Sequence, residues 1–370
     1  MQIGIPKEQK TMEGRVALTP DAVKSLTSTG HEVYIELGAG VLSGYTDNQY
    51  SHAGASLMPS AAMVYQSAQI IVKVKEPIES EWSLLKKEHI LFCFLHLAAN
   101  IPLLKKLTEI GLTAIAFETV AETDPDTKQL SLPLLAPMSA IAGRVTAQMG
   151  ATLQYQYRGG QGILFGGVDP QTNAQYNIDT GTVVVIGAGI AGAHAANTSA
   201  MLGARVIVLD INAERLKQLE DSSPNITGVI SNEESIREYV KQADLLIGAV
   251  LIPGAKAPHL VTAAMVDSMQ ANSVVMDISV DQGGCIETIH PTTYEAPVYM
   301  QGNVVHFGVT NIPGAVPRTA TQALSAAILP YLVTLVNTAE SGDWLNNVQI
   351  NQAINVKAGE IVHPALKDIH

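Results

Sequence analysis

The sequence predicts an α/β protein of two doubly wound parallel-sheet domains, one of which is inserted into the other. Three observations lead to this fold class. The chain has 370 residues, more than a single core usually accommodates. Short apolar runs alternate with segments of helical periodicity, as in parallel sheets covered by helices. A glycine-rich turn follows one of these apolar runs near the middle of the chain.

The first domain is predicted to begin at the N-terminus with a parallel sheet. Its expected strands are residues 2–5, 32–36, 70–74, 90–95 and 113–117. The segments between them with helical spacing are 20–29, 60–67, 80–87 and 101–110. The polar stretch 121–129 contains Asp124-Pro125-Asp126 and is expected to form an exposed turn near a domain edge. We therefore assign residues 1–130 to the first part of this domain.

The middle of the chain repeats the pattern more clearly. Its expected strands are residues 182–186, 205–210, 226–230, 244–249, 273–278 and 304–309. Six strands with helical connections make one complete dinucleotide-binding sheet, a Rossmann domain, which we place at residues 131–305. The remaining residues, 306–370, are too few for a comfortable third domain. The uncharged helix expected at 319–339 needs a surface to cover, so this segment is predicted to return to the first domain or to form a subunit contact.

The glycine-rich turn predicts a cofactor site. It reads Gly187-Ala188-Gly189-Ile190-Ala191-Gly192 and follows a strand with three consecutive valines. In such a turn, Gly187 permits the tight bend, Gly189 lets the backbone approach a pyrophosphate, and Gly192 lets helix and strand pack closely. The helix N-terminus then offers unpaired N–H groups and a positive dipole end to phosphates. A turn of structural value only is the alternative.

Asp210 indicates which dinucleotide is bound. It ends the second strand of this sheet, where its carboxylate can accept hydrogen bonds from ribose hydroxyls. A 2′-phosphate would meet like charge there, and Arg215 lies further along the chain, so NAD is favoured over NADP. The segments 250–254, 279–284 and 310–314 follow later strands and are expected to line the nicotinamide end, although each could be a simple turn.

Polar residues at strand ends of the first domain predict a site for chemistry. Arg15, Lys75, His96 and Glu118 each follow one of its strands, and we expect them to converge on one cleft facing the cofactor. An arginine and a lysine together indicate an anionic ligand, and a histidine suits proton transfer near neutral pH. Structural interpretations remain open: Arg15 on a surface loop, Lys75 in an exposed ion pair and His96 in the core. Asp281 in the other domain could hold an imidazolium or a substrate ammonium, or be a turn carboxylate.

Composition narrows the partners and the cellular location. The net charge of −12 argues against nucleic acid or an anionic membrane as partner, because phosphates would be repelled. Cys93 and Cys285 lie far apart in apolar or glycine-rich surroundings, so we expect buried thiols and no thiolate metal site. The N-terminus lacks the features of a signal peptide, and the polar residues spaced along 319–339 suit a helix packed within protein. A cytoplasmic location is expected.

Several motifs resemble those of one family. Gly4-Ile5-Pro6-Lys7-Glu8, followed by Glu13-Gly14-Arg15-Val16-Ala17-Leu18-Thr19-Pro20, resembles the opening of alanine dehydrogenases and of the transhydrogenase α subunit. The match extends to most of the chain through the segments 73–77, 94–98, 133–139, 254–258 and 277–285. The form Asp281-Gln282-Gly283-Gly284, and the absence of an appended membrane segment, look like alanine dehydrogenase rather than transhydrogenase.

The resemblance implies a reaction and a set of site residues. The reaction is the reversible NAD-dependent oxidative deamination of L-alanine to pyruvate, ammonia and NADH, in a cytoplasmic homohexamer. Arg15 and Lys75 would bind the substrate, and His96 and Asp281 would be catalytic. The remaining positions implied for NAD binding are Ser139, Asp210, Arg215, Val250, Leu251, Ile278, Ser279, Val280, Asp281, Val309, Asn311 and Ile312. His290 stands where the family can carry an arginine, so a pyrophosphate contact is not expected there.

Three other functions remain open from the residues alone. A lysine-forming or saccharopine-type dehydrogenase would share the architecture but needs room for a second amino acid. A soluble transhydrogenase component would pass hydride to a partner protein. A non-catalytic NAD sensor would keep Gly187, Gly189, Gly192 and Asp210 without needing the polar residues of the first domain.

Overall fold

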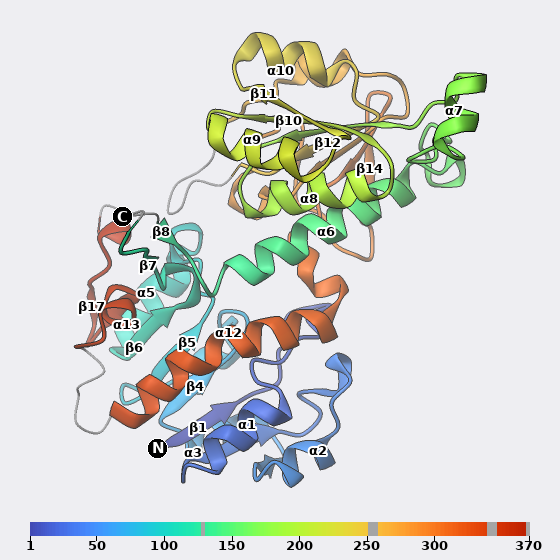
Figure 1. Cartoon of the computed structure of the whole chain (residues 1–370). Coiled ribbons are helices and arrows are strands. Elements are labelled where there is room, and N and C mark those ends of the chain that lie inside the picture. Colours follow the sequence, from blue (N-terminus) through green and yellow to red (C-terminus); the bar gives the residue numbers. More distant parts are fainter. Residues whose placement is uncertain (127–129, 251–257, 339–345, 368–370) are drawn as a thin grey trace. The chain divides into compact units, whose positions relative to one another are not determined.

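The protein consists of two compact α/β units (Figure 1). The computed structural model describes residues 1–126, 130–250, 258–338 and 346–367. Unit 1 comprises Met1–Met138 together with Val316–His370, and unit 2 comprises Ser139–Ala315. Both divisions lie later in the chain than the residues at which we placed the domain boundaries. In particular, the predicted boundary between residues 305 and 306 falls inside a strand of unit 2, β15 (Val304–Phe307).

Unit 1 contains an eight-stranded sheet in the order β17-β16-β6-β5-β4-β1-β2-β3. The five predicted strands are present and parallel, with ends up to two residues shorter. A sixth parallel strand, β3, joins one edge of the sheet, and the antiparallel strands β16 and β17 from the C-terminal segment form the other edge. We predicted none of these three strands. The strands are β1 (Gln2–Ile5), β2 (Glu32–Glu36), β3 (Ser56–Met58), β4 (Ile70–Val72), β5 (Ile90–Cys93), β6 (Thr113–Ala116), β16 (Ile354–Lys357) and β17 (Glu360–Ile361).

Helices of unit 1 begin and end at recognisable sequence signals. α5 (Ile101–Ile110) begins where the Asn100 side chain accepts a hydrogen bond from the Leu103 N–H, and it ends at Gly111 in the left-handed conformation. Leucines of α5 share a core with Ile71 and Leu91 of the sheet. The helix expected at 80–87 is a single turn, α4 (Glu79–Trp82). The other helices before residue 140 are α1 (Pro20–Thr27), α2 (Asp47–His52), α3 (Ala61–Ser67) and α6 (Ala136–Leu153).

The long helix α12 (Pro317–Thr338) packs within unit 1, against α1, as the expectation of a return to the first domain implies (Figure 1). Its buried residues recur at helical spacing from Ala320 to Val336. Thr321 Oγ1 accepts a hydrogen bond from the Val16 N–H at 3.0 Å. Among the residues that the structure describes, α12 is the helix long and apolar enough to cross a membrane. Its buried stripe is that of a core helix in a globular unit.

The expected polar turn at 121–129 is in fact part of a small hairpin. β7 (Glu122–Thr123) pairs antiparallel with β8 (Leu130–Ser131), and the described part between them is exposed. Residues 127–129 lie outside the described residues.

Unit 2 contains a seven-stranded sheet in the order β11-β10-β9-β12-β13-β15-β14. The first six are the predicted strands, all parallel. They follow the order of a dinucleotide-binding fold, in which successive strands are added on one side of β9 and then, from β12 on, on its other side. β14 adds an antiparallel edge that we did not predict. The strands are β9 (Thr182–Ile186), β10 (Arg205–Asp210), β11 (Ile226–Ile230), β12 (Leu245–Gly248), β13 (Val274–Asp277), β14 (Val298–Gln301) and β15 (Val304–Phe307).

Helices cover both faces of the sheet of unit 2. Figure 1 shows α8 (Ile190–Met201) and α9 (Ala213–Ser222) on one side of the strands and α10 (Glu233–Val240) on the other. α11 (Ala263–Asp267) packs beside α10. The fold class predicted from the sequence is confirmed.

Candidate functional site

The glycine-rich turn of unit 2 has the geometry expected of a phosphate-binding loop. Gly187 has φ of +105°, in the region that favours glycine, and a Cβ there would lie 2.8 Å from the Ala249 carbonyl oxygen. A Cβ on Gly192 would lie 1.8 Å from the Gly187 carbonyl oxygen, so α8 approaches the turn more closely than any other residue would allow. Gly189 is the N-cap of α8, and among the described residues no atom outside its chain neighbours and its own helix backbone lies within 4 Å of its Cβ position. The turn is therefore tight at two glycines and open at the third.

Asp210 holds the same turn from the end of β10. Its Oδ2 accepts a hydrogen bond from the Ala188 N–H at 2.6 Å, and its Oδ1 accepts one from the Asn212 N–H at 2.8 Å. Each oxygen has a second lone pair for a further donor. Arg215 lies exposed in the first turn of α9. The carboxylate predicted to recognise a ribose thus also shapes the backbone of the phosphate loop.

The segment after β13 is organised by the buried carboxylate of Asp277. Its Oδ1 accepts from the Ser279 N–H at 2.8 Å, and its Oδ2 accepts from the N–H groups of Cys285 and Ile286 at 2.7 and 3.2 Å. Burial raises the pKa of Asp277, while these backbone donors oppose that rise. Both ends of the segment that carries exposed Asp281 are thereby joined to one side chain.

The other predicted cofactor residues have varied surroundings. Ser279, Val280, Val309 and Ile312 are buried, whereas Ser139, Val250, Ile278 and Asn311 are half-buried. Leu251 lies outside the described residues. The ring of His290 stacks on Tyr299 with centroids 3.7 Å apart.

The residues of unit 2 fit a bound dinucleotide. An open helix N-terminus at Gly189, a turn that only glycine can make at Gly187, and a carboxylate at the end of the second strand are the donors and acceptors that such a ligand requires.

In unit 1, three strand ends bring predicted site residues to the same edge of the sheet. β1, β4 and β5 are neighbouring parallel strands, and Arg15, Lys75 and His96 lie in the segments that follow them. The carboxyl ends of parallel strands share one edge, so the segments that carry these three residues all begin at the same edge of the sheet.

Arg15 is buried, not a surface-loop residue. Its side chain is 3% exposed, and its Nε and Nη2 donate to the two carboxylate oxygens of Glu13 at 2.7 and 2.6 Å. Nη1 lies 3.3 Å from Met138 Sδ. A bidentate, charge-assisted pair of this kind holds the guanidinium plane in one orientation.

Lys75 is half-buried, next to a buried network of charges. Its backbone N–H and that of Val74 both point to Glu8 Oε1, at 3.4 and 2.6 Å. The preceding lysine, Lys73, is the fully buried one, with its Nζ 2.6 Å from Glu81 Oε1.

His96 is a partly exposed residue at the end of an apolar strand. Its backbone has φ of +47°, and its N–H donates to Glu118 Oε1 at 2.6 Å. The ring is 25% exposed, stacks on Phe94, and has its Nδ1 4.0 Å from Glu118 Oε1. The ring is thus accessible to a ligand, which the interpretation as a core histidine does not explain.

The sequence did not reveal the partners of these residues. Glu8 and Glu13 occur in the motifs quoted above, but no local spacing indicated that Glu8 would bind the backbone beside Lys75, because that contact spans 66 positions. Asp277 was likewise visible only as part of a motif.

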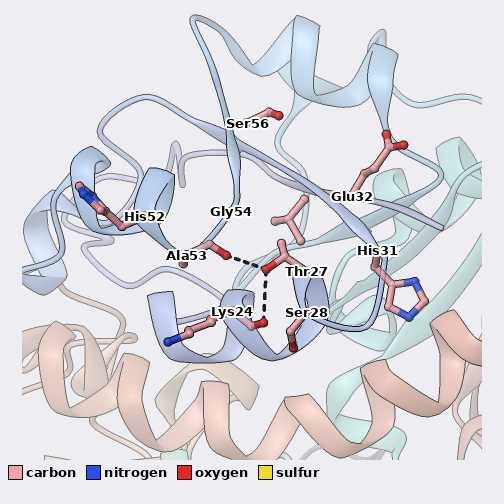
Figure 2. Close-up of a pocket in the computed structure, with 10 residues that line it drawn as sticks. Lys24, Thr27, Ser28, His31, Glu32, His52, Ala53, Gly54 and Ser56 are labelled. Carbon is pink, nitrogen blue, oxygen red and sulfur yellow. Dashed lines mark hydrogen bonds between the residues drawn. The ribbon is translucent and has the colours of Figure 1, made fainter.

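Unit 1 also has a shallow surface hollow that contains none of the predicted site residues (Figure 2). It is lined by residues of α1, the end of α2 and the start of β2, including Lys24, His31 and His52. Thr27 Oγ1 lies within hydrogen-bonding distance of the carbonyl oxygens of Lys24 and Ala53, as the dashed lines show.

The fold of unit 2 and its glycine-rich turn define a dinucleotide-binding protein. The polar residues that follow the strands of unit 1 include two cations and a histidine, residue types that bind small anions and transfer protons. The chain belongs to the alanine dehydrogenase/PNT family: the N-terminal domain of that family matches residues 4–142 and its C-terminal domain matches residues 146–364. It is an oxidoreductase of this family, and NAD(H) is its cofactor.

Individual relatives agree over the full length of the chain. An alanine dehydrogenase of Methanococcus maripaludis is 45% identical, over 100% of this chain and 96% of the relative. A solved structure of an L-alanine dehydrogenase is 46% identical, with a TM-score of 0.90 and coverage of 99% of this chain and 98% of the other. A transhydrogenase of Sinorhizobium meliloti is 27% identical, with a TM-score of 0.81 and coverage of 99% and 100%. The chain is therefore more similar to these alanine dehydrogenases than to that transhydrogenase.

Proposed function

We propose that this protein is an L-alanine dehydrogenase, which interconverts L-alanine and pyruvate plus ammonia with NAD as oxidant. The observation that carries the proposal is the grouping of Arg15, Lys75 and His96 at one edge of the sheet of unit 1. Two cations and a histidine suit a small keto or amino acid, which has one carboxylate to bind and an oxygen or nitrogen on the reacting carbon that gains and loses protons. The full-length similarity to alanine dehydrogenases supports the same conclusion.

Unit 1 is proposed to bind the substrate. The guanidinium of Arg15, which Glu13 holds through Nε and Nη2, would bind the substrate carboxylate. The ammonium of Lys75 would supply a second positive charge to the carboxylate and the carbonyl oxygen. Because the guanidinium is already oriented by Glu13, little side-chain freedom is lost when substrate binds.

Unit 2 is proposed to bind NAD, which when bound accepts the hydride from the Cα of alanine. The N-terminus of α8 at Gly189 would face the pyrophosphate, and Asp210 would accept hydrogen bonds from the ribose. The remaining proposed contacts are Ser139, Gly187, Gly192, Arg215, Val250, Leu251, Ile278, Ser279, Val280, Asp281, Val309, Asn311 and Ile312.

His96 is proposed as the general acid and base. After the hydride leaves, the imino carbon needs a water, and the imidazole would move protons on the reacting oxygen and nitrogen. Glu118 Oε1 lies 4.0 Å from His96 Nδ1 and accepts a hydrogen bond from the His96 backbone N–H, so it would help to position the imidazole. Asp281 is proposed as the second catalytic residue.

Assembly and location follow from the family resemblance and the composition. We propose a cytoplasmic homohexamer that interacts with small molecules, namely L-alanine, pyruvate and ammonium, and with neither nucleic acid nor membrane. The net charge of −12 supports the last point, because phosphates would be repelled.

A steady-state assay with L-alanine and NAD, compared with the His96→Gln variant, tests the function. The parent should form NADH, and His96→Gln should fold and bind NADH but turn over about 10²–10⁴-fold more slowly. The kcat/KM of the parent for pyruvate should depend on pH, and that dependence should be absent from the variant. Absence of NADH formation by the parent, with hydride passing instead to a second nucleotide, would favour a transhydrogenase. Retained turnover in a stably folded His96→Gln would move the catalytic role elsewhere.

A further inference from the structure

We infer that Glu8 is a positioning residue for substrate binding, because it fixes the peptide of Lys75 and joins it to the segment that carries Arg15. The inference rests on the proposed function, in which Arg15 and Lys75 hold the substrate carboxylate. It concerns a side chain that would not itself contact the substrate.

The main contact is between the carboxylate of Glu8 and the backbone after β4. On the side facing β5, this backbone stays paired, because the Lys73 N–H donates to the Phe92 carbonyl and Val74 accepts from Phe94. On the side facing β1, β4 pairs with β1 only as far as Ile71. Glu8 Oε1 supplies the missing acceptor for the Val74 N–H at 2.6 Å, with the Lys75 N–H at 3.4 Å.

A buried lysine stabilises the ionised carboxylate. Burial raises the pKa of Glu8, and the positive charge of Lys73, whose Nζ lies 3.7 Å from Glu8 Oε2, opposes that rise. Burial would lower the pKa of Lys73, but the carboxylates of Glu8 and Glu81 outweigh it and raise that pKa. Lys73 therefore favours the ionised form of Glu8, whereas the like charge of Glu81 opposes it.

A second ion pair joins the same two segments. Lys10, two positions beyond Glu8, pairs with Glu76, which directly follows Lys75. Residues 6–19, which contain Arg15, form neither helix nor strand and so have no regular backbone pairing to hold them. Two side-chain contacts with residues 74–76 thus restrain the distance between the backbones of Arg15 and Lys75.

This arrangement matters because two cations must meet one small anion. A carboxylate gains from both only if their positions are set before it binds, since ordering two loops at that moment would reduce the affinity. We expect the loss of the Glu8 charge to weaken substrate binding through Lys75 while leaving the NADH site in the other unit unchanged.

The experiment measures pyruvate binding by calorimetry to enzyme saturated with NADH, without ammonium, so that no turnover occurs. Glu8→Gln should raise the pyruvate Kd about tenfold, as when a charge-assisted hydrogen bond becomes neutral, with the NADH Kd unchanged. Glu79→Gln, an exposed glutamate of the adjacent α4, is the matched control and should leave both constants unchanged. A double-mutant cycle with Lys75→Met then asks whether Glu8 acts through Lys75.

Each outcome separates the inference from the function on which it rests. If Lys75→Met raises the pyruvate Kd and Glu8→Gln has no further effect in that background, the positioning role is supported. If Glu8→Gln leaves the Kd unchanged, or acts equally with and without Lys75, the inference is wrong. If Lys75→Met leaves pyruvate binding unchanged, the proposed role of Lys75 fails instead. Should Glu8→Gln not fold, Lys10→Met removes the second contact and should give a smaller rise that also depends on Lys75; an unchanged Kd overturns the inference.

Discussion

Two glycines of the phosphate loop should respond to the same substitution in opposite ways. In Gly192→Ala, the new methyl group would lie 1.8 Å from the Gly187 carbonyl oxygen, a distance that must open to at least 3.0 Å. In Gly189→Ala, the methyl group has no neighbour within 4 Å in the part of the chain that the structure describes, and φ of −68° is an ordinary value. One substitution therefore strains the folded loop, and the other only fills the space proposed for the pyrophosphate.

The expected magnitudes follow from these contacts. Overpacking of the kind that Gly192→Ala creates costs about 1–3 kcal/mol, partly offset by about 1 kcal/mol that alanine gains in a helix. We expect the Tm to fall by several degrees and NADH binding to weaken, because the helix start must move by more than an ångström. Gly189→Ala should change the Tm little. Losing one charge-assisted contact to a phosphate, about 1.5–3 kcal/mol, should raise its NADH Kd by roughly 10–150-fold.

The assay combines thermal unfolding with fluorescence titration of NADH on the same preparations. We expect Gly189→Ala to bind NADH weakly while keeping the Tm of the parent. We expect Gly192→Ala to show both a lower Tm and weaker NADH binding. Parental NADH affinity in Gly189→Ala would refute the placement of the pyrophosphate at the N-terminus of α8. Parental stability in Gly192→Ala would refute the close packing of α8 on the turn.

Three further predictions concern charged groups. Asp210→Ala should narrow the preference for NAD over NADP, and it should also weaken NADH binding because the Ala188 N–H loses its acceptor. If the ratio of kcat/KM for NAD to that for NADP is unchanged, another residue excludes the 2′-phosphate. Arg15→Ala should raise the pyruvate KM at least tenfold and lower the Tm, since removing one partner of a buried ion pair costs about 3–5 kcal/mol. The double variant with Glu13→Gln should recover the Tm but not the KM. Recovery of both would contradict a role of Arg15 in substrate binding. Burial lowers the pKa of His306, so the unfolded chain takes up the proton first as the pH falls below about 6.5, and stability declines with falling pH. His306→Gln should reduce the slope of Tm against pH between about 7.5 and 5.5, and an unchanged slope would contradict this account.

The parallel cores of both sheets could be predicted because their strands are buried on both faces. The runs 182–186 and 205–210 form β9 and β10 with the predicted bounds. A strand inside a parallel sheet buries the side chains of both its faces and therefore reads as a continuous apolar run. The edge strands could not be predicted in this way. β14 (Val298–Gln301) is largely exposed, so its short apolar run is not buried on both faces, and its strand conformation comes from pairing with β15.

For the candidate site, the sequence by itself determined which side chains stand at the strand ends: Arg15, Lys75, His96, Asp210 and the three glycines of the turn. These assignments need only the order of strands and the rule that parallel strands end at one edge. The tertiary structure decided which carboxylates hold the backbones of His96 and Lys75. Glu118 holds the His96 peptide across 22 positions, and Glu8 holds the peptide of Lys75 across 67. Periodicity reports which face of an element is buried, but a hydrogen bond between two loops depends on where the folded sheet places them, and no local pattern contains that distance.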